Sequence, residues 1–88
     1  MDEVTTWKAT IYLDEHDGQT RARAELQTDD RTLTGHGTAR LRPGEPDVPA
    51  IGDELAASRA LADLAHQLLD YAAGDVEAVL HTPVHLTS

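Results

Sequence analysis

The sequence predicts an α+β fold, a three-stranded antiparallel meander with one long helix packed on one face. Three observations lead to this fold class. Residues 5–41 contain three stretches in which apolar and polar side chains alternate, as in half-buried strands. Residues 52–73 repeat apolar side chains with a period near 3.6, as an amphipathic helix does. The chain has 88 residues, so we expect one α+β domain over residues 1–88.

The three predicted strands are separated by polar turns. They cover residues 5–13, 20–27 and 33–41. Asp17 and Gly18, in the first turn, suit the positive-φ positions of a tight hairpin.

Small residues share the inner face of the second and third strands. Glycine weakens a strand unless another element must come close to it. We therefore expect the helix to lie directly on a smooth surface made by these residues: Ala22, Ala24, Gly35, Gly37 and Ala39.

A connector with three prolines, residues 42–50, leads into the predicted helix. Asp53 and Glu54 suit the positive N-terminal end of that helix, and Gly74 suits its C-terminal cap. The stripe predicted to face the sheet is Ala57, Leu61, Leu64, Ala65, Leu68 and Ala72. The residues predicted to lie on the exposed face are Arg59, Asp63, His66 and Asp70. Residues 75–81 suit a short C-terminal helix or a strand, and the helix is preferred.

A second apolar stripe recurs every seven residues along the helix at Leu55, Ala62 and Leu69. It lies outside the main stripe, so one sheet layer does not readily cover both. Either the chain's own connector (Val48 and Ile51) and C-terminal segment cover this stripe, or a partner subunit does in a dimer. The C-terminal side chains in question are Val76, Val79 and Leu80.

The outer face of the predicted sheet collects basic side chains, although the chain has 16 acidic and 7 basic residues and a net charge of −9. The candidate partner- or anion-binding residues are Lys8, Arg21, Arg23, His36 and Arg40. Glu25 is the only acid expected among these strand positions. Such a face can bind an anionic partner such as the RNA backbone, or form a dimer interface. It can also be a solvated face that long side chains cover.

Composition argues against several function classes. The chain has no cysteine, which excludes disulfides and thiol nucleophiles. Its five histidines fall in different predicted elements, so we expect no metal site and no cofactor.

No arrangement of nucleophile, base and orienting group is evident, so no catalytic residue is predicted and we expect a non-enzymatic protein. We see neither a leader nor an apolar run of membrane-spanning length, and we expect a cytoplasmic protein with no membrane partner.

Four runs together resemble a known family. They are W-x-A-x-I-Y-L-D-E-H-x-G-x-T-R-A-x-A-x-L (7–26), L-x-G-x-G-x-A-R-L-x-P (33–43), V-P-A-I-G-D-E-L-A-A-S-R-A-L-A-D-L (48–64) and E-A-V-L-H-T-P (77–83). The chain is similar to an actinobacterial family of small proteins of unknown function, which includes the hypoxia- and dormancy-induced small proteins of mycobacteria. The resemblance implies a fold like that of double-stranded-RNA-binding domains (dsRBD-like), a homodimer, and a likeness to ribosome hibernation factors. It implies no catalytic or cofactor residues.

Two functional hypotheses follow. The first is a stress- or dormancy-associated protein that acts on the ribosome or on RNA through the basic sheet face. The alternative is a homodimeric protein-binding or structural module with no nucleic-acid contact.

Overall fold

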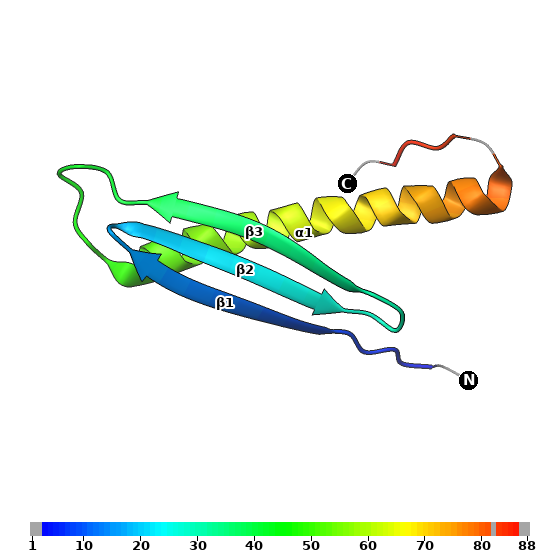
Figure 1. The fold of residues 1–88 in the computed structure, drawn as a ribbon, viewed down its shortest axis with the longest axis horizontal. Helices are drawn as coiled ribbons and strands as arrows, with labels where there is room; N and C mark the ends of the chain where they lie inside the picture. Colours follow the sequence, from blue (N-terminus) through cyan, green and yellow to red (C-terminus); the bar gives the residue numbers. More distant parts are fainter. Residues whose placement is uncertain (1–2, 82, 87–88) are drawn as a thin grey trace.

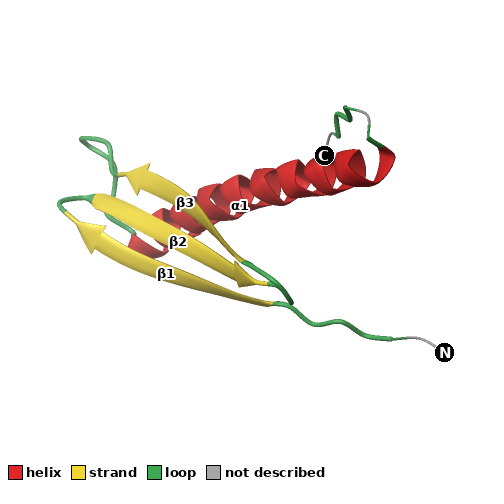
Figure 2. Cartoon of the chain, turned by 45° about the vertical axis from the view of Figure 1, so that its right-hand side comes forward, coloured by secondary structure: helices red, strands yellow, loops and turns green. Residues whose placement is uncertain are grey.

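The computed structural model describes residues 3–81 and 83–86. It contains three strands, β1 (Lys8–His16), β2 (Gln19–Gln27) and β3 (Thr32–Arg40), followed by one helix, α1 (Pro49–Leu80). The strands form an antiparallel sheet in the order β1-β2-β3, and α1 lies across one face (Figure 1). The predicted fold class is confirmed. The second view shows the two layers, with the C-terminal part of α1 extending past the sheet (Figure 2).

The β1–β2 hairpin is tighter than the predicted turn over residues 14–19. Asp17 and Gly18 have φ angles of 51° and 73° and alone form the turn, so their predicted role is confirmed. Because a two-residue turn leaves its neighbours in register, Asp14 pairs with Arg21 inside the sheet. β1 therefore begins and ends later than predicted.

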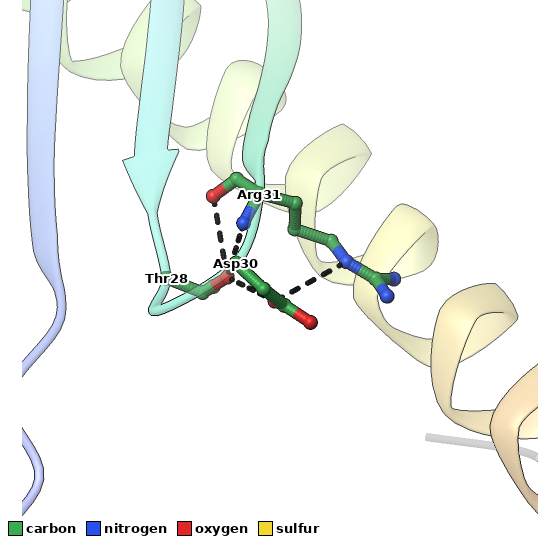
Figure 3. Close-up of polar contacts among 3 residues, drawn as sticks. All are labelled: Thr28, Asp30 and Arg31. Carbon is green, nitrogen blue, oxygen red and sulfur yellow. Dashed lines mark hydrogen bonds and ion pairs between the residues drawn. The ribbon is translucent and has the colours of Figure 1, made fainter.

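The β2–β3 turn is closed by the side chain of Thr28 (Figure 3). The Thr28 hydroxyl accepts a hydrogen bond from the Arg31 backbone N–H at 3.2 Å, and it lies 3.2 Å from Asp30 Oδ1. The Thr28 backbone N–H donates to the Arg31 carbonyl at 2.9 Å. Threonine and aspartate favour such turns because their side chains bond to nearby backbone groups.

The core lies between α1 and the inner faces of β2 and β3. Burial alternates along both strands, as the period of two predicts. A Cβ atom at Gly37 would overlap the backbone of Ala56 and Ala60, and one at Gly35 would overlap the Ala60 carbonyl. The predicted close approach of the helix to these glycines is confirmed.

α1 is one continuous helix of 32 residues, which corrects three predictions about its ends. It begins at Pro49, so Asp53 and Glu54 lie beyond the first turn. Gly74 lies inside the helix and caps nothing. The predicted short C-terminal helix is absent from the described residues, because residues 75–80 continue α1. Extending an existing helix adds one backbone bond per residue, whereas starting a second helix requires a new nucleus. The cap is His81, whose N–H donates to the Glu77 carbonyl at 2.7 Å.

The buried stripe of α1 is rotated from the predicted one. Leu64 is buried and Leu68 packs against the core, as predicted. Ala56 and Ala60 are buried with them, whereas Leu61 is 42% exposed. Ala65 and Ala72 are also exposed, and Ala57 is half-buried. The reason is the small inner face of β3. A surface without side chains admits the helix backbone, and alanines fit this contact better than leucines.

The second apolar stripe is half-buried at Leu69 and exposed at Ala62 and Leu55. Residues 83–86 return along α1 (Figure 1), and the Val84 N–H donates to Glu77 Oε1 at 2.8 Å. Leu69 is half-buried, whereas Ala62 is exposed and Leu55 is 43% exposed. At the exposed end, Leu55 lines a hollow together with Val48 and Ile51, which are themselves exposed. Ile51, Val76, Val79 and Leu80 all belong to α1.

Candidate partner-binding surface

The outer face of the sheet is the face that α1 does not cover. Alternation along the strands and the pairing register place all five candidate residues on it: Lys8, Arg21, Arg23, His36 and Arg40. Arg23 pairs with Tyr12 on one side and His36 on the other, and Arg21 lies next along β2. Lys8 and Arg40 lie at opposite ends, eight strand positions apart, or about 27 Å. We call this surface the outer sheet face.

The outer sheet face carries one acid more than predicted. Asp14 belongs to β1, and its Oδ1 lies 3.3 Å from Arg21 Nε. Glu25 Oε1 lies 3.2 Å from Arg23 Nε. Such exposed ion pairs contribute little to stability. The outer sheet face has four basic and two acidic side chains, so its formal charge is +2 when histidines are taken as neutral. The whole chain, in contrast, has a formal net charge of −9.

One aromatic ring lies among these charges. The Arg23 guanidinium carbon lies over the Tyr12 ring, 4.5 Å from its centroid, in a cation–π contact. Thr10, Thr34 and Thr38 occupy neighbouring outer positions. The face therefore offers guanidinium, hydroxyl and aromatic groups, which suit an anionic partner better than a cationic one.

The free edge of β3 is closed by side chains of α1. Arg59 Nη1 donates to the Thr38 carbonyl at 2.6 Å and Gln67 Nε2 to the Thr34 carbonyl at 2.7 Å. Between them, the His36 backbone N–H donates to Asp63 Oδ2 at 2.8 Å. We call Arg59, Asp63 and Gln67 the β3 clamp.

The spacing of the β3 clamp explains why it fits. Four helix residues advance about 6 Å, and two strand residues advance about 6.8 Å. Every fourth residue of α1 therefore meets every second residue of β3. Arg59 and Asp63 were predicted to lie on the exposed face of the helix. Arg59 is exposed and Asp63 is half-buried, and both reach the edge of β3. The sequence signal for the β3 clamp is a row of polar residues spaced four apart along the helix. The sequence does not show that a strand edge lies beside this row.

Asp63 has a pKa below its ordinary value of 3.8. The largest cause is the hydrogen bond that its carboxylate accepts from the His36 backbone N–H. A hydrogen bond from Gln67 and the charges of His36 and His66 lower the pKa further, while desolvation opposes them.

The free edge of β1 is open, in contrast to that of β3. All nine residues of β1 are exposed, because α1 lies over β2 and β3. On its helix-side face, Ile11 is 38% exposed and Leu13 is 43% exposed. The structure thus places two exposed surfaces, a charged face and an open edge with apolar side chains, on neighbouring parts of the sheet.

Two hollows lie at the ends of the sheet. One of about 200 Å³ is lined by Leu41 and Ile51 around the buried Thr20, and one of about 350 Å³ lies between Trp7 and Tyr71. Within residues 3–81 and 83–86, no group of three or more histidine or acidic side chains is placed to hold a metal ion. In the same residues no helix is long and apolar enough to cross a membrane.

Comparison with known proteins gives consistent matches over nearly the whole chain. A family profile described as Rv2632c-like matches residues 5–85. The uncharacterized protein Mb1767 of Mycobacterium bovis is 48% identical over 80 residues, which is 91% of this chain and 85% of that protein. The uncharacterized protein Rv2632c of Mycobacterium tuberculosis is 47% identical over 79 residues, 90% of this chain and 85% of that one. The crystal structure of Rv2632c superposes with a TM-score of 0.85 at 44% identity, covering 93% of this chain and 98% of that chain.

Proposed function

The chain belongs to the Rv2632c-like family, and we propose that it is a non-enzymatic, cytoplasmic protein that binds ribosomal RNA through its outer sheet face. In this role it acts as a stress- or dormancy-associated factor comparable to ribosome hibernation factors. The observation that carries the proposal is charge segregation. The outer sheet face is net positive in a chain whose net charge is −9, and no other described element covers it.

Two further features support RNA as the partner. The basic residues extend over about 27 Å of strand length, so that the face can contact several phosphates along one backbone. The family resemblance, which implies a dsRBD-like fold, also favours RNA as the partner. Since phosphate contacts release counterions, a face with four basic residues should bind weakly and in a salt-dependent manner.

Co-sedimentation with purified ribosomes tests this proposal. We expect association at about 50 mM salt that weakens at about 150 mM, and a loss of at least tenfold in the variant Arg21→Glu with Arg23→Glu. The matched control is Arg31→Glu with Arg42→Glu, which changes the net charge equally but off the outer sheet face. Circular dichroism verifies that both variants fold.

The outcomes are distinct. Wild-type protein that stays in the supernatant at both salt concentrations would exclude the ribosome as the partner. Equal losses in both double variants would show that net charge, rather than the outer sheet face, governs association.

A second candidate function is a homodimeric protein-binding or structural module without nucleic-acid contact. The open edge of β1, with Ile11 and Leu13 exposed beside it, favours this candidate. Capture from stressed cells of one protein partner and no RNA would support it over the RNA proposal.

A further inference from the structure

The hydrogen bonds of the β3 clamp identify which backbone groups of β1 are unpaired. The clamp bonds the even-numbered residues of β3, so the odd-numbered ones bond β2. In the pairing register, Gly35 lies opposite Ala24 and Gly37 opposite Ala22, so the even-numbered residues of β2 form the backbone hydrogen bonds to β3. The odd-numbered residues of β2 therefore form the backbone hydrogen bonds to β1. Their partners in β1 are even-numbered, such as Tyr12 opposite Arg23. The N–H and C=O groups of the odd-numbered residues of β1 therefore point away from the sheet: Ala9, Ile11, Leu13 and Glu15.

Apart from Glu15 near the hairpin, this edge lacks the features by which proteins protect a free strand. Protected edges are short, bulged, covered, or carry proline or an inward-pointing charge. β1 is nine residues long, contains no proline and pairs with β2 without a bulge. Its inner face presents Ala9, Ile11 and Leu13 along most of its length, with one charge, Glu15, at the hairpin end. The β3 clamp has no counterpart here among the described residues. The fold closes one edge and leaves the other ready to pair.

The sequence of β1 is complementary to itself. We propose that β1 pairs antiparallel with β1 of a second copy about a two-fold axis at Ile11, joining two sheets into one of six strands. In this register the unpaired odd-numbered residues face one another, as the hydrogen bonds require, with Ile11 opposite Ile11 and Ala9 opposite Leu13 of the second copy.

Charge selects this register among those that satisfy the hydrogen bonds. With the axis at Ile11, Lys8 lies directly opposite Asp14 of the second copy, and the pair occurs twice. With the axis at Tyr12, Lys8 lies opposite His16 and Thr10 opposite Asp14, so no opposite charges face each other. Directly opposed charges of opposite sign stabilise a strand pair. Asp14 Oδ1 approaches Arg21 within its own chain, which leaves the second carboxylate oxygen for Lys8.

The pairing also joins the two outer sheet faces into one surface with eight basic and four acidic side chains. This inference therefore deepens the proposed function and its dimer candidate. Pairing through β1 can be tested without RNA. A negative result for this pairing therefore leaves RNA binding undecided, and a negative result for RNA binding leaves the pairing undecided.

Single introduced cysteines test the register, since the chain has none of its own. In the proposed pair the two Ile11 Cα atoms are about 5.5 Å apart, within disulfide range, so Ile11→Cys should form a covalent dimer on mild oxidation. Leu13→Cys is the matched control, because the two Leu13 residues would be about 13 Å apart along the strands and should not cross-link. Cross-linking of Leu13→Cys but not of Ile11→Cys would overturn the register.

Light scattering tests the interface itself. The unaltered protein should have twice the 9.5 kDa mass of one chain, and Lys8→Asp should weaken the dimer at least tenfold. Lys8→Asp combined with Asp14→Lys should restore it. Leu13→Pro should yield a folded monomer, because the Leu13 N–H has no partner within its own sheet. Tyr12→Pro should unfold, since it removes a bond to β2. A monomeric wild-type protein at about 100 µM, or a Leu13→Pro variant that stays dimeric, would overturn the proposal.

Discussion

Asp63 holds the edge of β3 through one backbone hydrogen bond, and its charge makes this contact depend on pH. Because the contact lowers the pKa in the folded state, the contribution to stability is complete above the ordinary value of 3.8. It is lost as the pH falls through the lowered folded-state pKa. We therefore predict that Asp63→Asn is less stable than wild type at pH 7 and that the difference shrinks toward pH 3.

Urea unfolding at pH 7 and pH 3 measures this difference. The control is Arg59→Ala, which breaks the neighbouring contact to Thr38 and leaves the Asp63 carboxylate in place. Its loss of unfolding free energy should be the same at both pH values. A deficit of Asp63→Asn that is the same at both pH values would contradict the role given to the carboxylate.

Gly37 is the residue at which α1 comes closest to the sheet. A methyl group there would meet the backbone of Ala56 and Ala60, which cannot move aside as a flexible side chain can. We expect Gly37→Ala to lower the free energy of unfolding by about 3 kcal/mol. Thr38→Ala, on the opposite face of the same strand, should cost less than about 1 kcal/mol. Thermal or chemical unfolding of the two variants compares these losses, and equal losses would argue against the close contact.

At the scale of the element, the continuity of α1 through Gly74 is the feature most open to test. Gly74 is exposed, and a Cβ atom there would have no neighbour within 4 Å. Inside a helix, alanine is more stable than glycine by about 1 kcal/mol. Gly74→Ala should therefore raise the unfolding free energy by up to this amount, as measured by chemical denaturation.

Gly18 provides the contrasting case. Its φ of 73° in the β1–β2 turn strains any residue with a side chain, so Gly18→Ala should be destabilising. A loss of stability in Gly74→Ala as well would indicate that the chain turns at Gly74, as a helix cap would require.

At the scale of the whole molecule, the single chain is elongated. Its radius of gyration is 16.8 Å, whereas a compact domain of this length has about 12 Å. The helix of 32 residues extends about 48 Å, and strands of nine residues only about 30 Å, so part of α1 has no sheet beneath it (Figure 2). The buried core consists of five alanines and three leucines, together with the glycines under α1. Such a core stabilises one copy only modestly, which agrees with a protein that pairs through β1.

The sequence by itself determined the local structure of this protein. The period-two alternation specified the strands, and Asp17-Gly18 specified the hairpin. The glycines and alanines of β3 indicated where the helix would approach. These features could be predicted because each depends on a few neighbouring residues. Gly74 was misread because a lone glycine can either cap a helix or be tolerated inside one, at a cost of about 1 kcal/mol.

Only the tertiary structure decided which face of α1 is buried and which sheet edge is closed. Periodicity identifies a leucine-rich stripe, but burial depends on the shape of the opposing surface, and β3 presents no side chain to α1 at Gly35 and Gly37. Ala56 and Ala60 therefore lie against the sheet together with Leu64, and this rotation turns Arg59, Asp63 and Gln67 onto the edge of β3. The same placement leaves β1 uncovered. No pattern within β1 could reveal this, because an edge is open or closed according to where a distant helix lies.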